Sequence, residues 1–133
     1  MPLEILNKRR GGFTLVEIMI VVAIIALLAT IALPGFLRAR KRSQAARVID
    51  DLRTIDSAVD QYALETNRKG GDVVTTTDWT NYVKVGTSLY ITGQSILGHA
   101  YGAQTVDSVP KVPTLTRAAL SDVADTAFWS PFN

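Results

Sequence analysis

One acidic side chain, Glu17, lies inside a long apolar stretch near the start of this 133-residue chain. Two glycines, Gly11 and Gly12, come shortly before it, and residues 8–10 are all basic. A carboxylate in an apolar environment is costly unless a cation or a hydrogen-bond donor compensates it. The chemistry that this pattern predicts is therefore charge pairing, in which Glu17 meets a cation at its own depth in that environment.

The apolar stretch is long enough to form a membrane-spanning helix. Residues 13–37 contain one ionisable side chain, Glu17, and a helix of that length, at about 1.5 Å per residue, exceeds a hydrocarbon core of roughly 30 Å. A carboxylate at the bilayer centre costs roughly 2.5–3.5 kcal/mol, and less near a helix end. We expect a single span with one functional charge.

The segment Gly12-Phe13-Thr14-Leu15-Val16-Glu17 resembles the cleavage and N-methylation motif of type IV pilins and type II secretion pseudopilins. The resemblance implies that a prepilin peptidase/N-methyltransferase cuts after Gly12 and methylates the new amino terminus, Phe13. It also implies that the Glu17 carboxylate neutralises the terminal amine of a neighbouring subunit. Cutting at this place creates a cation at the depth of the isolated anion.

Two ordinary explanations fit this segment less well. A secretory signal has an apolar region of about 7–15 residues followed by a small-residue cleavage site, whereas here the glycines precede a longer apolar region. A plain single-pass anchor, with Glu17 extended to the membrane interface, explains the charge but not the glycine motif.

The charges are distributed unevenly along the chain. The chain has 14 basic and 12 acidic side chains, of which three basic and one acidic lie in residues 1–12. The processed chain therefore has 11 of each and is neutral overall. No nucleic-acid partner is expected. Four further basic residues follow the span: Arg38, Arg40, Lys41 and Arg42. Charge counting therefore leaves the orientation ambiguous. The resemblance implies a cytoplasmic leader, with the second basic cluster near outer-leaflet phosphates, neighbouring subunits or solvent.

A second helical stretch is predicted after the span, at residues 38–66. Apolar residues at steps of three and four form one stripe, which indicates a helix with one buried face. The stripe consists of Ala45, Val48, Leu52, Ile55, Val59, Tyr62 and Thr66. Pro34 should kink or loosen an otherwise continuous helix, and Asn67, Gly70 and Gly71 should end it.

The carboxyl-terminal part is predicted to be a small region of short elements. Helices are expected at residues 77–83, capped by Thr77, and at 116–124, with strands at 89–92 and 101–106. A sheet this small is not stable alone, so we expect its apolar face to pack on the stripe of the long helix. The expected fold class is α+β and type IV pilin-like: a long bent amino-terminal helix packed on a small antiparallel sheet with short helices.

These elements divide the chain into four predicted parts. They are a cleaved cytoplasmic leader (1–12), a transmembrane and polymerisation helix (13–37), its amphipathic continuation (38–66) and a small globular region (67–133).

Conventional catalytic and metal-binding groups are scarce. The chain has no cysteine and one histidine, His99, so the usual ligands of a zinc site and a Cys–His nucleophile are lacking. Asp107, Asp122 and Asp125 offer carboxylates for calcium, which the resemblance to major pseudopilins implies, but surface aspartates near a helix end explain their spacing equally well. No other cofactor and no enzymatic activity are expected.

The hypothesis that joins these observations is a structural subunit of a pseudopilus for type II protein secretion. Its expected partners are the prepilin peptidase, further copies of itself, other pseudopilins, an assembly platform in the bacterial inner membrane and the lipid bilayer, with the carboxyl-terminal region in the periplasm. A type IV pilus subunit, serving adhesion, motility or DNA uptake, is the alternative. The lack of cysteine, and a weaker resemblance of residues 96–102 to the D-P-W-G-N-P-Y segment of major pseudopilins, favour the pseudopilin. A membrane-tethered binding or enzymatic module is a remote third hypothesis.

Overall fold

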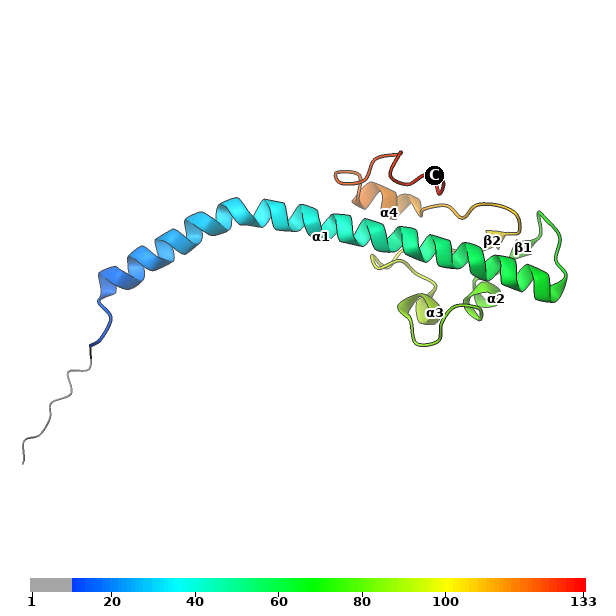
Figure 1. The fold of residues 1–133 in the computed structure, drawn as a ribbon, viewed down its shortest axis with the longest axis horizontal. Coiled ribbons are helices and arrows are strands. Elements are labelled where there is room, and N and C mark those ends of the chain that lie inside the picture. The colour runs from blue at the N-terminus through cyan, green and yellow to red at the C-terminus, as the bar shows by residue number, and fades with distance from the viewer. Residues whose placement is uncertain (1–10) are drawn as a thin grey trace, which may run out of the picture. The chain divides into compact units, whose positions relative to one another are not determined.

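The computed structural model describes residues 11–133, so most of the predicted leader lies outside the described residues. The element order is α1 (Leu15–Thr66), β1 (Val73–Val74), α2 (Thr76–Thr80), α3 (Ser88–Thr92), β2 (Gln104–Thr105) and α4 (Thr114–Ala119). The fold class is α+β, as predicted (Figure 1). The chain forms two compact units, and the boundary between them lies within α1, after Leu37.

The first unit contains the apolar part of α1. All its described side chains are exposed. Among the described residues, α1 is the one helix long and apolar enough to cross a membrane. The helix continues through Pro34 without interruption, and the expected kink there stays a prediction.

The second unit is built on the amphipathic part of α1. Six of the seven stripe residues are buried, which confirms the predicted face: Ala45, Val48, Leu52, Ile55, Val59 and Tyr62. Thr66, in the last turn of the helix, is exposed instead, and its hydroxyl donates to the Tyr62 carbonyl at 2.6 Å. The helix ends where predicted, with Asn67 at φ 54°.

The hydrophobic core joins this face of α1 to residues from the whole carboxyl-terminal region. Trp79 and Trp129 are its largest fully buried side chains, and the indole N–H of Trp79 donates to the Gly102 carbonyl at 3.1 Å. Within this unit, Figure 1 shows α4 on one side of α1 and α2 with α3 on the other. The short elements thus pack on the stripe, as predicted.

The predicted strand at residues 89–92 is wrong, because this segment forms helix α3. Its first turn is capped by Thr87, whose hydroxyl accepts the Tyr90 N–H at 3.2 Å, and Gly93 ends it at φ 62°. A side chain at Gly93 would also meet the Thr76 methyl at 2.7 Å. Good caps at both ends therefore outweigh the β-branched and aromatic content of the segment.

Other boundaries move by a few residues. Helix α2 is capped by Thr75 rather than the predicted Thr77, with Asp78 accepting the Thr75 N–H at 3.1 Å. Helix α4 starts and ends earlier than the predicted 116–124. Strand β2 lies within the predicted 101–106 segment and pairs antiparallel with β1, which the sequence did not predict.

Candidate functional site

Residues 11–14, directly before α1, form an exposed, non-helical segment that contains the predicted cleavage site. Gly11 and Gly12 have no heavy atom within 4 Å of the position that a Cβ would occupy. Phe13 follows with 85% of its surface exposed. A peptidase can therefore reach the bond between Gly12 and Phe13 without displacing any described part of the chain.

Glu17 takes part in a reciprocal cap at the start of α1. Its Oε2 accepts the Thr14 N–H at 3.0 Å, and the Thr14 hydroxyl accepts the Glu17 N–H at 3.2 Å. This is a capping box, which satisfies two backbone donors that have no partner within the helix. The sequence contains the known signature of this cap, Thr-x-x-Glu directly before an apolar run, although the cap was not predicted.

Because of the capping box, the Glu17 carboxylate already has a hydrogen-bond donor in its own chain. Glu17 is held by its own chain, and the partial positive charge of a helix amino terminus also favours an anion there. A carboxylate offers about four acceptor positions on its two oxygens, so the bond to Thr14 leaves capacity for a cation. The arrangement can fix an anion at a defined height on the helix and present it to an approaching amine.

Two of the three aspartates considered for calcium have partners of their own. Asp122 forms an ion pair with Lys41 at 2.8 Å, and the Lys41 ammonium lowers the pKa of Asp122. Asp125 accepts the Phe128 N–H at 2.8 Å, and Asp107 lies after β2 at φ 61°. The described residues contain no group of three or more His, Cys, Asp or Glu side chains suited to a metal ion. Calcium binding stays a prediction.

His99 links a loop to α4. Its Nδ1 lies 2.8 Å from the hydroxyl of Thr116, which is fully buried, and the Ser95 hydroxyl lies 3.4 Å from the same atom of Thr116. The histidine therefore holds the segment after α3 against α4.

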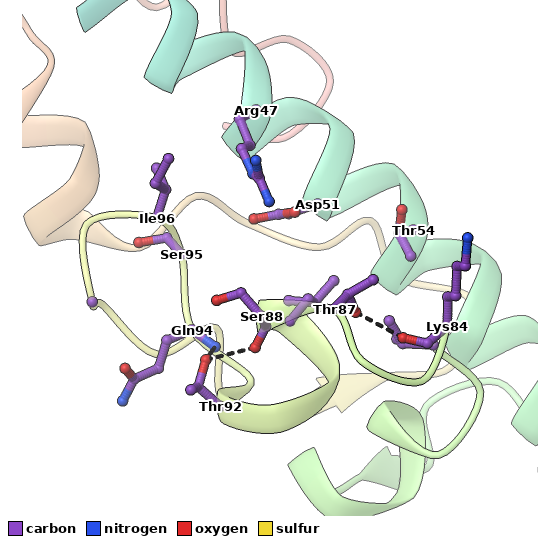
Figure 2. Close-up of a pocket in the computed structure, with 13 residues that line it drawn as sticks. Arg47, Asp51, Thr54, Lys84, Thr87, Ser88, Thr92, Gln94, Ser95 and Ile96 are labelled. Carbon is purple, nitrogen blue, oxygen red and sulfur yellow. Dashed lines mark hydrogen bonds between the residues drawn. The ribbon is translucent and has the colours of Figure 1, made fainter.

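A polar hollow of about 530 Å³ opens in the second unit, beside α1 and α3 (Figure 2). Arg47 and Asp51 project into it from α1. Burial raises the pKa of Asp51, while the hydroxyl of Tyr101, at 3.0 Å, and the charge of Arg47 oppose that rise. The hydroxyls of Thr87 and Thr92 donate to backbone carbonyls at 2.8 Å. These two hydroxyls are therefore committed to the backbone at the two ends of α3.

Comparison with known families identifies the amino-terminal segment. Residues 7–33 match the family model described as the prokaryotic N-terminal methylation motif. The chain carries a prokaryotic N-terminal methylation motif. This motif implies processing by a prepilin peptidase, and together with the apolar helix it indicates that the chain is anchored in a membrane.

Three curated relatives each match slightly less than half of the chain. The type II secretion system core protein G of Aeromonas hydrophila is 31% identical over 62 residues, which is 47% of this chain and 43% of that protein. The type IV major pilin protein PilA of Myxococcus xanthus is 42% identical over 62 residues, 47% of this chain and 28% of that protein. A fimbrial protein of Pseudomonas aeruginosa is 41% identical over 58 residues, 44% of this chain and 38% of that protein.

The match thus spans less than half the length of each of these relatives. No solved structure shows a significant match. Relatives of both kinds, secretion core proteins and pilins, support a pilin-like subunit that carries the methylation motif.

Proposed function

We propose that this chain is a structural subunit that a prepilin peptidase processes and that polymerises through α1 into a pseudopilus for type II protein secretion. The observation that carries the proposal is the exposed glycine segment directly before α1, whose apolar part up to Leu37 has one charge, Glu17, which lies in the capping box. Processing, anchoring and assembly each use a different part of this arrangement.

Processing uses the exposed segment. The described backbone at Gly11 and Gly12 is not part of a helix or strand, and proteolysis favours such segments. Cleavage after Gly12 gives Phe13 a free amine, which the same enzyme methylates. The amine is then separated from Glu17 by about one helical turn.

Assembly uses the apolar surface. The side chains of α1 up to Leu37 are exposed within the chain, and an apolar surface of this extent must be covered by lipid or protein. Before assembly the lipid bilayer covers it. In the filament the same helices of neighbouring copies, together with other pseudopilins, replace the lipid.

Charge pairing sets the alignment of the copies. An apolar helix packs on another at many axial offsets with similar energy, whereas a carboxylate and an amine pair at one offset only. In our proposal the Phe13 amine of one copy therefore pairs with Glu17 of its neighbour. Pairing within one chain is the competing arrangement, and in that case the alignment of copies does not depend on Glu17.

The proposed location is the bacterial inner membrane, with the leader in the cytoplasm and residues 38–133 in the periplasm. An assembly platform in that membrane is the expected partner for extraction into the filament. A type IV pilus subunit remains the second candidate, supported by identities of 42% and 41% to pilin-type relatives. The lack of cysteine favours the pseudopilus.

The test is mass spectrometry of the amino terminus after expression with an active prepilin peptidase. We expect a chain that begins with N-methylated Phe13, and we expect Gly12→Val to retain the intact leader. Gly11→Val is the matched control, because it makes the same change one residue away from the cut and should leave processing intact. Recovery of the parent chain with its leader would contradict the proposal.

The choice between the two filaments needs a second measurement. The processed chain is produced with the assembly platform of a type II secretion system or with that of a type IV pilus, and filaments are imaged. We expect filaments with the secretion platform. Filaments with the pilus platform alone would establish the alternative.

A further inference from the structure

A group of basic residues lies directly after the apolar part of α1. We call Arg38, Arg40, Lys41 and Arg42 the basic collar. No acidic residue occurs between residues 18 and 49, so the collar is the first charge after Glu17. At about 100° per residue, these four positions point to several sides of the helix rather than along one stripe. The three arginines are exposed and Lys41 is partly buried.

One acidic side chain faces the collar. Asp122 pairs with Lys41 at 2.8 Å, and the charges of both Lys41 and Arg38 lower the pKa of Asp122. In the described part of the chain, the salt bridges do not include Arg38, Arg40 or Arg42. Four cations and one anion therefore leave an excess of three positive charges around the helix.

The place of the collar indicates what compensates this excess. It begins at Arg38, the residue after the last one of the apolar unit. In a bilayer, the layer that follows the hydrocarbon core is the headgroup region, whose phosphates accept paired hydrogen bonds from guanidinium groups. We propose that the basic collar binds the phosphates of anionic lipid headgroups at the end of the span. This inference rests on the membrane anchoring in the proposed function.

The arrangement of the collar favours lipid over a protein partner. Before assembly, a single protein partner would meet the helix from one side, whereas lipids surround it and offer phosphates to arginines that point in different directions. The Asp122 carboxylate competes with those phosphates for Lys41. Lipid binding should therefore respond to Asp122 as well as to the arginines.

The test measures which lipids surround the collar. Because the chain has no cysteine, Ser43→Cys gives one attachment point for a donor dye beside the collar, at an exposed position. The full chain is placed in phosphatidylcholine vesicles that contain a minority of phosphatidylglycerol, with an acceptor dye on the acyl chain of one lipid or the other. We expect energy transfer to phosphatidylglycerol to exceed that to phosphatidylcholine about two-fold, and the excess to disappear in roughly 1 M salt.

Three variants sharpen the result. Arg38→Gln, Arg40→Gln and Arg42→Gln together should remove the excess. Arg53→Gln, Lys69→Gln and Lys111→Gln together are the matched control, since they remove the same charge from exposed positions and should keep the excess. Asp122→Asn frees Lys41 and should increase it.

Equal transfer to both lipids from an inserted parent chain would overturn the collar proposal and leave the anchoring intact. Loss of the excess in the control variant as in the collar variant would also overturn it. Vesicle flotation in alkaline carbonate reports insertion separately. A parent chain that does not insert would contradict the anchoring itself, and the collar proposal with it.

Discussion

The two stretches of α1 differ in what covers their apolar side chains. Up to Leu37 the described side chains are all exposed, whereas the stretch from Arg38 buries eight. The apolar side chains of the second stretch are covered by residues of the same chain, including the distant Trp129. One continuous helix therefore serves two environments. The sequence distinguishes the two stretches, because the first is apolar on all sides of the helix and the second is apolar on one side only.

The largest effect should come from the one charge in the first stretch. We expect Glu17→Leu to leave membrane insertion intact, because it removes the ionisable group from the span. Filament yield should fall by roughly ten-fold or more, because the charge pair that aligns the copies is lost. Negative-stain imaging and a shear assay measure the yield, once normal cleavage is confirmed. Parental filament yield would refute the pairing between subunits.

Glu17→Gln separates the charge from the cap. Glutamine can still accept the Thr14 N–H in a capping box, but it carries no charge to pair with the Phe13 amine. We expect this variant to assemble as poorly as Glu17→Leu. If Glu17→Gln assembles normally and Glu17→Leu does not, then the cap at Thr14 determines assembly and the ion pair does not.

A matched pair of leucines tests the contrast directly. Leu52 is fully buried in the second stretch, and Leu28 in the first has 60% of its surface exposed. We expect Leu52→Ala to lower the free energy of unfolding by about 2–5 kcal/mol and Leu28→Ala by less than about 0.5 kcal/mol. The free energy of unfolding is measured by urea denaturation of the full chain in detergent, with tryptophan fluorescence as the signal. Fluorescence reports unfolding of the second unit because both tryptophans are buried there. Equal losses of unfolding free energy in the two variants would contradict the difference in burial between the two stretches.

The smallest effect is a pH dependence within the second stretch. Burial raises the pKa of Asp51 above its ordinary value of 3.8, so the folded chain binds this proton more readily than the unfolded chain. The contribution of Asp51 to stability therefore grows as the pH falls through the raised pKa toward 3.8, and it is lost as the pH rises. Asp122 acts in the opposite sense. Its lowered pKa gives a contribution that is present above 3.8 and lost as the pH falls through the lowered value.

Asp51→Asn should flatten this dependence. Asparagine still accepts the Tyr101 hydroxyl, which lies 3.0 Å from the Asp51 oxygen, but it does not titrate. Urea unfolding between about pH 4 and pH 7 compares the variant with the parent chain. An unchanged pH dependence in Asp51→Asn would show that burial of this carboxyl has no consequence for stability.

The parts of the fold that the sequence predicted are those in which many residues repeat one pattern. The stripe from Ala45 to Tyr62 covers five helical turns, so the average over many residues indicates a helix. Strand β1 is two residues long, too short to have a period. Segment 89–92 has strand-like composition, but the helix there depends on two single residues, Thr87 and Gly93, which composition does not weigh.

The candidate site also has one part that the sequence predicted and another that it did not. Glu17 was predicted because a lone charge in an apolar run is easily seen. Its partner in the structure, Thr14, was not predicted, because a lone carboxylate in an apolar run indicates a cation, whereas the cap depends on the backbone donors of the first turn. The separation of Asp107, Asp122 and Asp125 depends on the path of loops after β2 and α4. That path follows from side-chain contacts spread over the whole carboxyl-terminal region.

The composition of the core also determines when folding can be completed. Its helix stripe is synthesised first, yet its last members are Trp129 and Phe132, and the Val112 N–H donates to the Phe132 carbonyl at 3.0 Å. Contacts between residues so far apart in the chain cannot form until Trp129 and Phe132 have left the ribosome. If the chain crosses the membrane during synthesis in the proposed orientation, this core therefore closes only after Trp129 and Phe132 have reached the far side.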